Sequence, residues 1–297
     1  MGQRTYVILA ERGILKIAGP DARPFLQGLI SNDINKVSAS RAIYATFLTP
    51  QGRYLHDFFV AEIGGVFAVD CEAGRLDDLK RRLTMFKLRS KIEITDESDK
   101  FLVAAIPADG ASFDLEGPAG TAREWEGGAV FVDPRLAAAG LRAILPRESA
   151  EAALKTAGLS PGAPADYEHM RITLGLPDGS RDMPVEKAIL LENGLDELNG
   201  IDWDKGCYLG QELTARTKHR GLVRKRLLPV SIEGPIPPPG TKIMSGEKEA
   251  GEMHTAVDGA GLAMLRLEFL EGASGKDGGF TAGGARITPH KPDWAVF

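Results

Sequence analysis

The chain has 297 residues, of which 43% are hydrophobic and 26% are charged, and its formal net charge is -5. This is the composition of an ordinary globular protein that is long enough for two or three lobes. A sequence pI near 5.7 excludes the overall basic surface of a nucleic-acid-binding domain, so we expect no nucleic-acid partner and, at most, a local anion site.

The two cysteines, Cys71 and Cys207, lie far apart in the sequence. They provide neither a disulfide framework nor a paired zinc spacing, so we expect a reducing compartment and no metal site. The first residues lack the apolar core of a secretory signal, and no apolar run reaches the roughly 18 residues of a membrane span. We therefore expect a soluble cytoplasmic protein with no membrane partner.

The N-terminal part of the chain predicts a strand followed by a helix. A short strand is expected at 14–17, and an apolar stripe from Ala22 to Ile30 predicts a helix that Asp21 can cap. The helix is expected to end at three polar residues that can face a cavity, which are Ser31, Asn32 and Asp33.

The next segment predicts a hairpin within 42–63, whose turn Thr49-Pro50-Gln51-Gly52 has proline and glycine at its second and fourth positions. With no glycine-rich phosphate loop nearby, this hairpin favours an α+β fold with a mixed or antiparallel sheet over a dinucleotide-binding fold. Further strands are expected at 66–70, 91–95, 101–106, 129–133 and 141–146, and helices at 76–86, 148–157 and about 165–174.

The pattern of apolar and polar residues changes twice after the last of these helices. Weak periodicity from Gly175 to Asn199 predicts a long loop, and long loops in compact domains often carry function. After residue 225, short apolar runs, many glycines and a Pro-Pro-Pro-Gly turn at 237–240 predict a small β-barrel or sandwich. We therefore place a domain boundary near 225.

The motif KGCYLGQE, residues 205–212, is the strongest functional candidate in the chain. A helix is expected from about 209 to 218, which places Cys207 just before its N-terminus, where the helix dipole stabilises a thiolate. The positive charge of Lys205 would also stabilise the thiolate form of Cys207. Gly206 and Gly210 leave room for a ligand or another backbone to approach closely.

Two alternatives remain open at this point. A lone cysteine is often a buried, inert residue, so the inert and functional readings of Cys207 have about equal weight. The run 216–226 has six Lys or Arg residues. It is either a solvated face or interdomain connector, or an anion site in which arginine grips a carboxylate.

The motif and the segment TARTKHRG that follows it closely resemble the signature of the YgfZ family, whose folate-binding proteins support the assembly and repair of iron-sulfur clusters. The family is related to the glycine-cleavage T-protein, an aminomethyltransferase. The resemblance extends over most of the chain, through the segments GPDARPFLQGLISNDI, FLTPQGRYLHDFFV, RITLGLP and GLAMLRLE.

This resemblance implies an α+β, three-lobed, aminomethyltransferase-like fold. Two lobes at 1–224 would form the folate-binding region and a β-barrel at 225–297 would close it. Tetrahydrofolate or a derivative is the implied cofactor, and iron-sulfur client or assembly proteins are the implied partners. Cys207 would be the functional thiol, with Lys205, Gln211 and Glu212 shaping its surroundings. The candidate folate contacts are Asn32, Asp33, Asp57, Arg171 and Tyr208.

The sequence also departs from the T-protein pattern. His56 stands where the first of two adjacent acids is expected, so only Asp57 remains, and Thr173 replaces a glutamate. Both departures favour an accessory factor over an enzyme. The alternatives are a folate-dependent one-carbon transferase that uses Asp57 as its acid-base group, and a folded scaffold in which the motif is purely structural.

Overall fold

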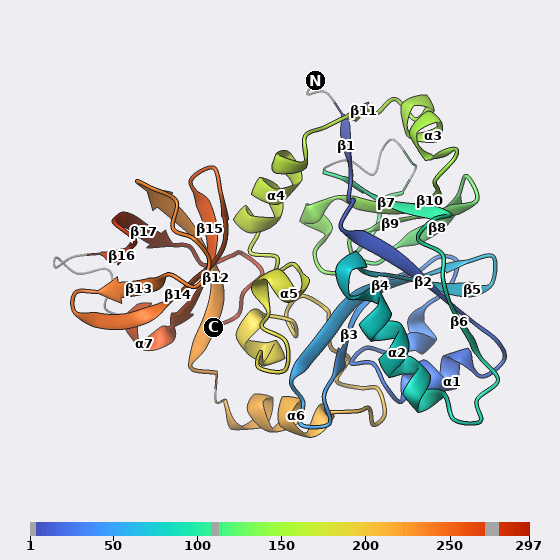
Figure 1. Ribbon diagram of the computed structural model, residues 1–297, viewed down its shortest axis with the longest axis horizontal. Helices are drawn as coiled ribbons and strands as arrows, with labels where there is room; N and C mark the ends of the chain where they lie inside the picture. The colour runs from blue at the N-terminus through green and yellow to red at the C-terminus, as the bar shows by residue number, and fades with distance from the viewer. Residues whose placement is uncertain (1–3, 108–112, 114, 222, 271–278) are drawn as a thin grey trace.

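The computed structural model describes residues 4–107, 113, 115–221, 223–270 and 279–297, and places them in two sheets with flanking helices and a closed barrel (Figure 1). The predicted α+β class with a C-terminal barrel is confirmed. In the described part of the chain, no helix is long and apolar enough to cross a membrane.

The first sheet contains the predicted hairpin. Strands β3 and β4 pair in antiparallel register, with Thr46 opposite Asp57. Gly52 in their turn has a φ of +77°, which a side chain would disfavour. Helix α2 (Leu76–Lys87) buries Leu76, Leu79 and Leu83 in the core of this lobe. The strand order is β3 (Ile43–Leu48), β4 (Tyr54–Ile63), β5 (Val66–Glu72), β2 (Arg12–Ala18) and β6 (Glu93–Asp96).

The second sheet gathers strands from three separate parts of the sequence. The N-terminal strand β1 pairs with β7, and the chain then continues into β2 of the first sheet, so it connects the two lobes. The strand order is β11 (Ser160–Pro161), β1 (Thr5–Ile8), β7 (Phe101–Ile106), β10 (Leu141–Pro146), β9 (Gly128–Val132) and β8 (Ala122–Trp125).

The C-terminal strands form a closed barrel in which β12 pairs with both β15 and β17. Closure leaves no free edge, and alternate side chains fill the interior. The order is β12 (Lys225–Glu233), β15 (Ala260–Arg266), β14 (Lys248–Val257), β13 (Lys242–Ser245), β16 (Phe280–Ala282) and β17 (Ala285–Pro289). The remaining helices are α1 (Ala22–Gln27), α3 (Ala150–Thr156), α4 (Pro164–Thr173), α5 (Gly179–Asp182), α6 (Gln211–Arg220) and α7 (Leu267–Leu270).

The first predicted helix is shorter than its apolar stripe. Helix α1 ends at Gln27, and Ile30 forms a β-bridge with Phe47 instead of another helical turn, because pairing with β3 competes with the local pattern. The prediction that Asp21 caps this helix is wrong. Its carboxylate accepts a hydrogen bond from the backbone N–H of Lys91 at 2.7 Å.

The motif helix and the predicted loop also differ from expectation. Helix α6 begins at Gln211 rather than near 209, because Gly210 has a φ of +82°, which is incompatible with a right-handed helix. The segment 175–199 contains α5 and a 3-10 helix at Leu190–Asn193. Each has only four residues, which is too short to produce a recognisable hydrophobic period in the sequence. The expectation that Gly175 follows the end of α4 is confirmed, since its φ is +74°.

Candidate functional site

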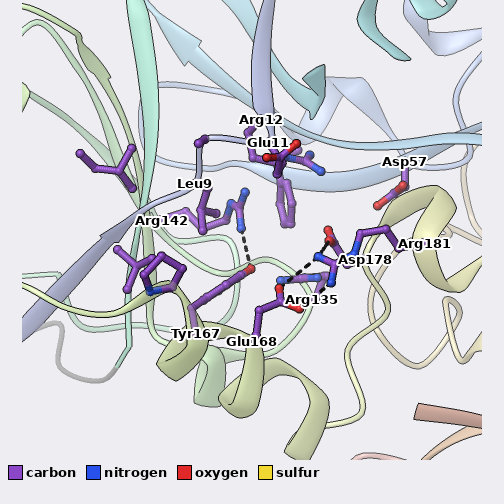
Figure 2. A pocket seen from close by; sticks show the side chains of 15 residues that line it. Leu9, Glu11, Arg12, Asp57, Arg135, Arg142, Tyr167, Glu168, Asp178 and Arg181 are labelled. Carbon is purple, nitrogen blue, oxygen red and sulfur yellow. Dashed lines mark hydrogen bonds and ion pairs between the residues drawn. The ribbon is translucent and has the colours of Figure 1, made fainter. Parts of the chain in front are cut away.

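A cavity of about 290 Å³ lies where both sheets meet α4 and the segment around α5. Its lining comes from the β1–β2 connection, β4, β10 and the loop before β10, together with the two helices. Figure 2 shows acidic and arginine side chains from these segments pointing toward one space. The elements that converge here are distant in sequence, as expected of a site built between lobes.

Three arginines surround one aromatic ring in this cavity. The guanidinium carbons of Arg12, Arg135 and Arg142 lie 5.7, 4.9 and 4.0 Å from the ring centroid of Phe59. These distances fall within the range of cation–π attraction. Phe59 is therefore a buried ring that three planar cations contact.

Buried carboxylates hold these arginines in place. Asp70 accepts hydrogen bonds from Arg12 Nε at 2.6 Å and from Arg142 Nε and Nη2 at 3.1 and 2.6 Å. Asp133 binds Arg135 through both carboxylate oxygens, at 3.1 and 2.8 Å. Because Arg142 comes from β10 and Asp70 from β5, their ion pair joins the two sheets behind the cavity.

Asp57 is the buried carboxyl group of the cavity. The hydroxyls of Tyr44 and Tyr54 donate to its two oxygens at 2.8 and 2.6 Å. Burial raises the pKa of Asp57, while Arg12 and the two tyrosines oppose that rise. Asp57 lies near the start of β4. A carboxyl group in this position can accept hydrogen bonds from a ligand or exchange a proton with it.

Arg171, a predicted folate contact, lies behind the cavity wall. Its fully buried guanidinium donates to Glu168 at 3.0 and 2.9 Å and to Asp182 at 2.8 Å. Asp182 also accepts from the hydroxyl of Thr255 on β14, at 2.6 Å, which ties this network to the barrel. Burial acts to raise the pKa of Glu168, but Arg171 and Arg181 lower it overall. Arg171 therefore positions Glu168, which lines the cavity.

His56 points away from the cavity because successive strand residues face opposite sides. Its Nε2 lies 3.0 Å from a carboxylate oxygen of Asp78 on α2. Burial, followed by the nearby positive charge of Arg75, lowers the pKa of His56 to about 4. The histidine that replaces the first acid of the T-protein pattern therefore stabilises the first lobe and does not line the cavity.

This position predicts a pH dependence of stability. As pH falls from about 6.5 to about 4, the unfolded chain binds a proton at His56 that the folded chain does not, so stability is lost across this window, by up to about 3 kcal/mol. The substitution His56→Gln, which keeps a donor for Asp78, should remove this loss. Urea unfolding of both proteins between pH 7 and 4.5 measures it, and equal pH slopes would contradict the assignment.

Lys205 fastens the motif to the end of α1. Its ammonium donates to the backbone carbonyls of Gln27, Ile30 and Asn32 at 2.9, 2.5 and 2.9 Å. Burial lowers the pKa of Lys205 to about 8, against the charges of Asp33 and Asp202. These three hydrogen bonds fix the segment that carries the motif, and the effect of the Lys205 charge on the thiol stays a prediction.

Cys207 is exposed, and a side chain added at the neighbouring Gly206 would meet nothing within 4 Å. It precedes α6 by four residues, so it does not occupy the first turn of that helix. Gly210 does allow a backbone to approach, since an added Cβ would lie 2.4 Å from the carbonyl oxygen of Thr49 in the β3–β4 turn. The same added Cβ would lie 3.1 Å from the Cα of Gly52 in that turn.

The other motif residues have local partners. The side-chain oxygen of Gln211 accepts from the backbone N–H of Tyr208 at 3.2 Å, and the ring of Tyr208 is buried. Glu212 is exposed and pairs with Arg216, which lies one helical turn later on α6, at 2.8 Å. Neither Cys207 nor these neighbours line the cavity that contains Asp57. Among the described residues, no group of three His, Cys, Asp or Glu side chains is placed to hold a metal.

Asn32 lines a second cavity of about 440 Å³, together with Tyr44 and Asp202. Its amide donates to the carbonyls of Tyr44 and Asn199 at 2.8 and 2.7 Å, whereas Asp33 caps a short 3-10 helix. Of the predicted folate contacts, Asp57 lines the first cavity and Asn32 lines the second, whereas Asp33, Arg171 and Tyr208 line neither. Tyr44 connects the two cavities, because its hydroxyl binds Asp57 of the first cavity.

Comparisons with known proteins assign the chain to a family. A family model described as the CAF17 C-terminal beta-barrel domain matches residues 224–297. The iron-sulfur cluster assembly factor IBA57, mitochondrial, of Mus musculus is 34% identical over 282 residues, covering 88% of this chain and 77% of that protein. The Homo sapiens protein of the same name is also 34% identical, over 281 residues and with the same coverage. The chain belongs to the IBA57 family of iron-sulfur cluster assembly factors.

The resemblance to YgfZ proteins is thereby confirmed. The crystal structure of glycine cleavage system aminomethyltransferase T from Bartonella henselae has a TM-score of 0.78 at 13% identity, and the match covers 99% of this chain and 87% of that one. This likeness shows that the IBA57-family chain has the aminomethyltransferase-like fold. Both mammalian relatives are named as mitochondrial, so their names do not support the prediction of a cytoplasmic protein.

Sequence reasoning missed most of the cavity in this IBA57-family chain. Arg12, Phe59 and Arg142 stand in ordinary strand patterns, where they are indistinguishable from surface or core residues. One signal was available: an aspartate in the apolar strand VFAVDC requires a buried partner, and Asp70 has two. That signal pointed to arginines without saying which ones.

Proposed function

We propose that this protein binds tetrahydrofolate or a derivative in the cavity at Asp57 and supports the assembly or repair of iron-sulfur clusters in client proteins, with Cys207 as its functional thiol. The observation that carries the proposal is the exposed Cys207 thiol, on a segment that Lys205 fixes to α1, in a chain of the IBA57 family. The iron-sulfur cluster is cargo in this proposal, since one thiolate supplies only one of its ligands.

The cavity suits the ring system of a folate. Its volume of about 290 Å³ is near the lower end of ligand pockets, which hold about 300–1,000 Å³. Phe59 adds an apolar part to the cavity wall, and Asp57 can accept hydrogen bonds from the ring N–H and amino groups of a pteridine. Arg181 is 45% exposed at the cavity and is the cation for the carboxylates of the glutamate tail.

The folate part of the proposal has a direct test by calorimetric titration with tetrahydrofolate. The substitution Asp57→Asn should weaken binding by about 10- to 100-fold, because it replaces a charged acceptor with a neutral amide. The matched control is Asp33→Asn, at the half-buried cap of the 3-10 helix outside the cavity, which should bind folate like the wild type. Weakened binding by Asp33→Asn with unchanged binding by Asp57→Asn would instead favour a site at the Asn32 end.

The alternative function is folate-dependent aminomethyl transfer. Asp57, held between two tyrosine hydroxyls in a fold like that of the T-protein, is the observation that favours it. Turnover of an aminomethyl donor in the presence of tetrahydrofolate would support the transferase. Folate binding without turnover, together with rescue of a cluster-dependent radical enzyme in cells lacking the gene, would support the accessory factor.

A further inference from the structure

The C-terminal end of α2 presents three apolar side chains to solvent. Met85, Phe86 and Leu88 are 66%, 39% and 89% exposed. We call these three residues the α2 tip. Single exposed apolar residues are ordinary, but three within four positions form a local cluster.

The backbone at the α2 tip is strained as well as exposed. Leu88 has a φ of 42° and a ψ of -109°, a conformation that side chains larger than that of glycine rarely adopt. The N–H of Ser90 donates to the carbonyl of Lys87 at 2.8 Å and closes a turn around it. Neither the strained backbone nor the exposed apolar side chain of Leu88 stabilises the folded chain. This combination indicates a role in contacting another molecule.

The surroundings of the α2 tip are basic. Residues 80–91, KRRLTMFKLRSK, include six Lys or Arg and no Asp or Glu, in a chain whose net charge is -5. Arg81 and Arg82 pair with Asp78, while Lys87, Arg89 and Lys91 have no ion pair with any residue that the structure describes. The tip therefore combines an apolar centre with a cationic border.

A short series of contacts joins the α2 tip to the segment that carries Cys207. Phe86 packs edge-on against Phe47 with ring centroids 6.0 Å apart, and Phe47 is bridged to Ile30, whose carbonyl accepts from Lys205. Leu209 packs against the same core cluster. Figure 1 shows the lower end of α2 next to α1, with α6 at the same edge of the molecule.

We propose that the α2 tip is a docking surface for an acidic iron-sulfur protein, whose cluster then faces Cys207. This inference rests on the proposed function. Charge complementarity favours an acidic partner, and an apolar recess on that partner would remove Met85 and Leu88 from water. A protein is favoured over a membrane because Cys207 supplies one cluster ligand, so the other ligands must come from a molecule seated on this face.

The test uses the full chain and a purified acidic iron-sulfur carrier protein loaded with its cluster. The double substitution Met85→Ser with Leu88→Asn should weaken binding at least about tenfold, because it removes both apolar anchors. Met85 and Leu88 are both exposed, so the variant should unfold within a few degrees of the wild-type temperature. The control Val296→Asn, at a valine that is 82% exposed in the C-terminal segment, should bind as the wild type does.

A second variant and two further measurements decide between occupants. The charge variant Lys87→Glu with Arg89→Glu should also weaken carrier binding, and wild-type binding should fall as salt rises. Equal carrier binding by the wild type and both variants would overturn the proposal. So would tip-dependent binding to phosphatidylserine vesicles, or tip-dependent self-association in the ultracentrifuge.

Cell rescue separates this inference from the proposed function. If the tip variants restore a cluster-dependent enzyme fully while Cys207→Ser does not, the docking surface is wrong and the proposed function stands. If Cys207→Ser restores it fully, the proposed thiol role fails whatever the tip variants do. Reduced rescue by stably folded tip variants, with normal rescue by Val296→Asn, supports the surface.

Discussion

Replacing Cys207 with serine is expected to abolish the rescue of a cluster-dependent radical enzyme in cells that lack the native gene, while the protein stays folded. The thiol is exposed, and the neighbouring Gly206 has open space around it. A surface substitution of this kind changes the free energy of unfolding by no more than about 0.5 kcal/mol. Serine keeps the size of the side chain but is a far weaker ligand and nucleophile for iron-sulfur chemistry.

Enzyme activity in cell extracts and a thermal unfolding curve check this expectation together. Cys71 provides an internal control, because it is buried and its burial raises the pKa of its thiol to about 12. A thiol-alkylating reagent should therefore label native wild-type protein at Cys207 and leave the native Cys207→Ser protein unlabelled. Full rescue by a folded Cys207→Ser protein would exclude the thiol role.

Replacing Asp70 with asparagine is expected to destabilise the protein by about 3–5 kcal/mol, the usual cost of removing one partner of a buried ion pair. Asp70 is fully buried and accepts from both Arg12 and Arg142, whose side chains are 6% and 2% exposed. The amide group of asparagine would place a donor against one of the two guanidinium groups. We expect the unfolding temperature to fall by roughly 10 °C.

Thermal unfolding measures this loss, and the exposed pair Lys242–Glu249 on the barrel supplies the control. The substitution Glu249→Gln should leave the unfolding temperature nearly unchanged, because water already solvates both groups. The same Asp70→Asn protein, studied below its unfolding temperature, should also bind tetrahydrofolate more weakly, since Arg12 and Arg142 would no longer be held around Phe59. An unchanged unfolding temperature would show that the Asp70 pairs are not important for stability.

A continuous set of contacts links the cavity at Asp57 to the motif. Asp57 accepts from the hydroxyl of Tyr44, the carbonyl of Tyr44 accepts from Asn32, and the carbonyl of Asn32 accepts from Lys205. Lys205 lies two residues before Cys207 in the sequence. The cavity and the Cys207 thiol are therefore two distinct sites that a series of hydrogen bonds connects. In the proposed function, folate and the thiol accordingly have different roles.

The sequence alone determined the features that depend on neighbouring residues. The proline and glycine of Thr49–Gly52 specify a hairpin turn, and short strands with glycine-rich turns specify the C-terminal sheet structure. The eight residues of KGCYLGQE identified the family, because a long specific motif is read directly from the chain. Expectations failed where tertiary contact competed with local pattern, as where Ile30 leaves α1 to pair with Phe47.

Only the tertiary structure decided what surrounds each functional group. Arg142 and Asp70 are 72 positions apart, and Lys205 binds carbonyls as far as 178 positions away. Helical and strand periodicity show which face of an element is buried but not which other element covers it. The arginine-lined cavity, the contacts of Lys205 and the pairing of His56 with Asp78 all depend on that covering, so none of them could be read from the sequence.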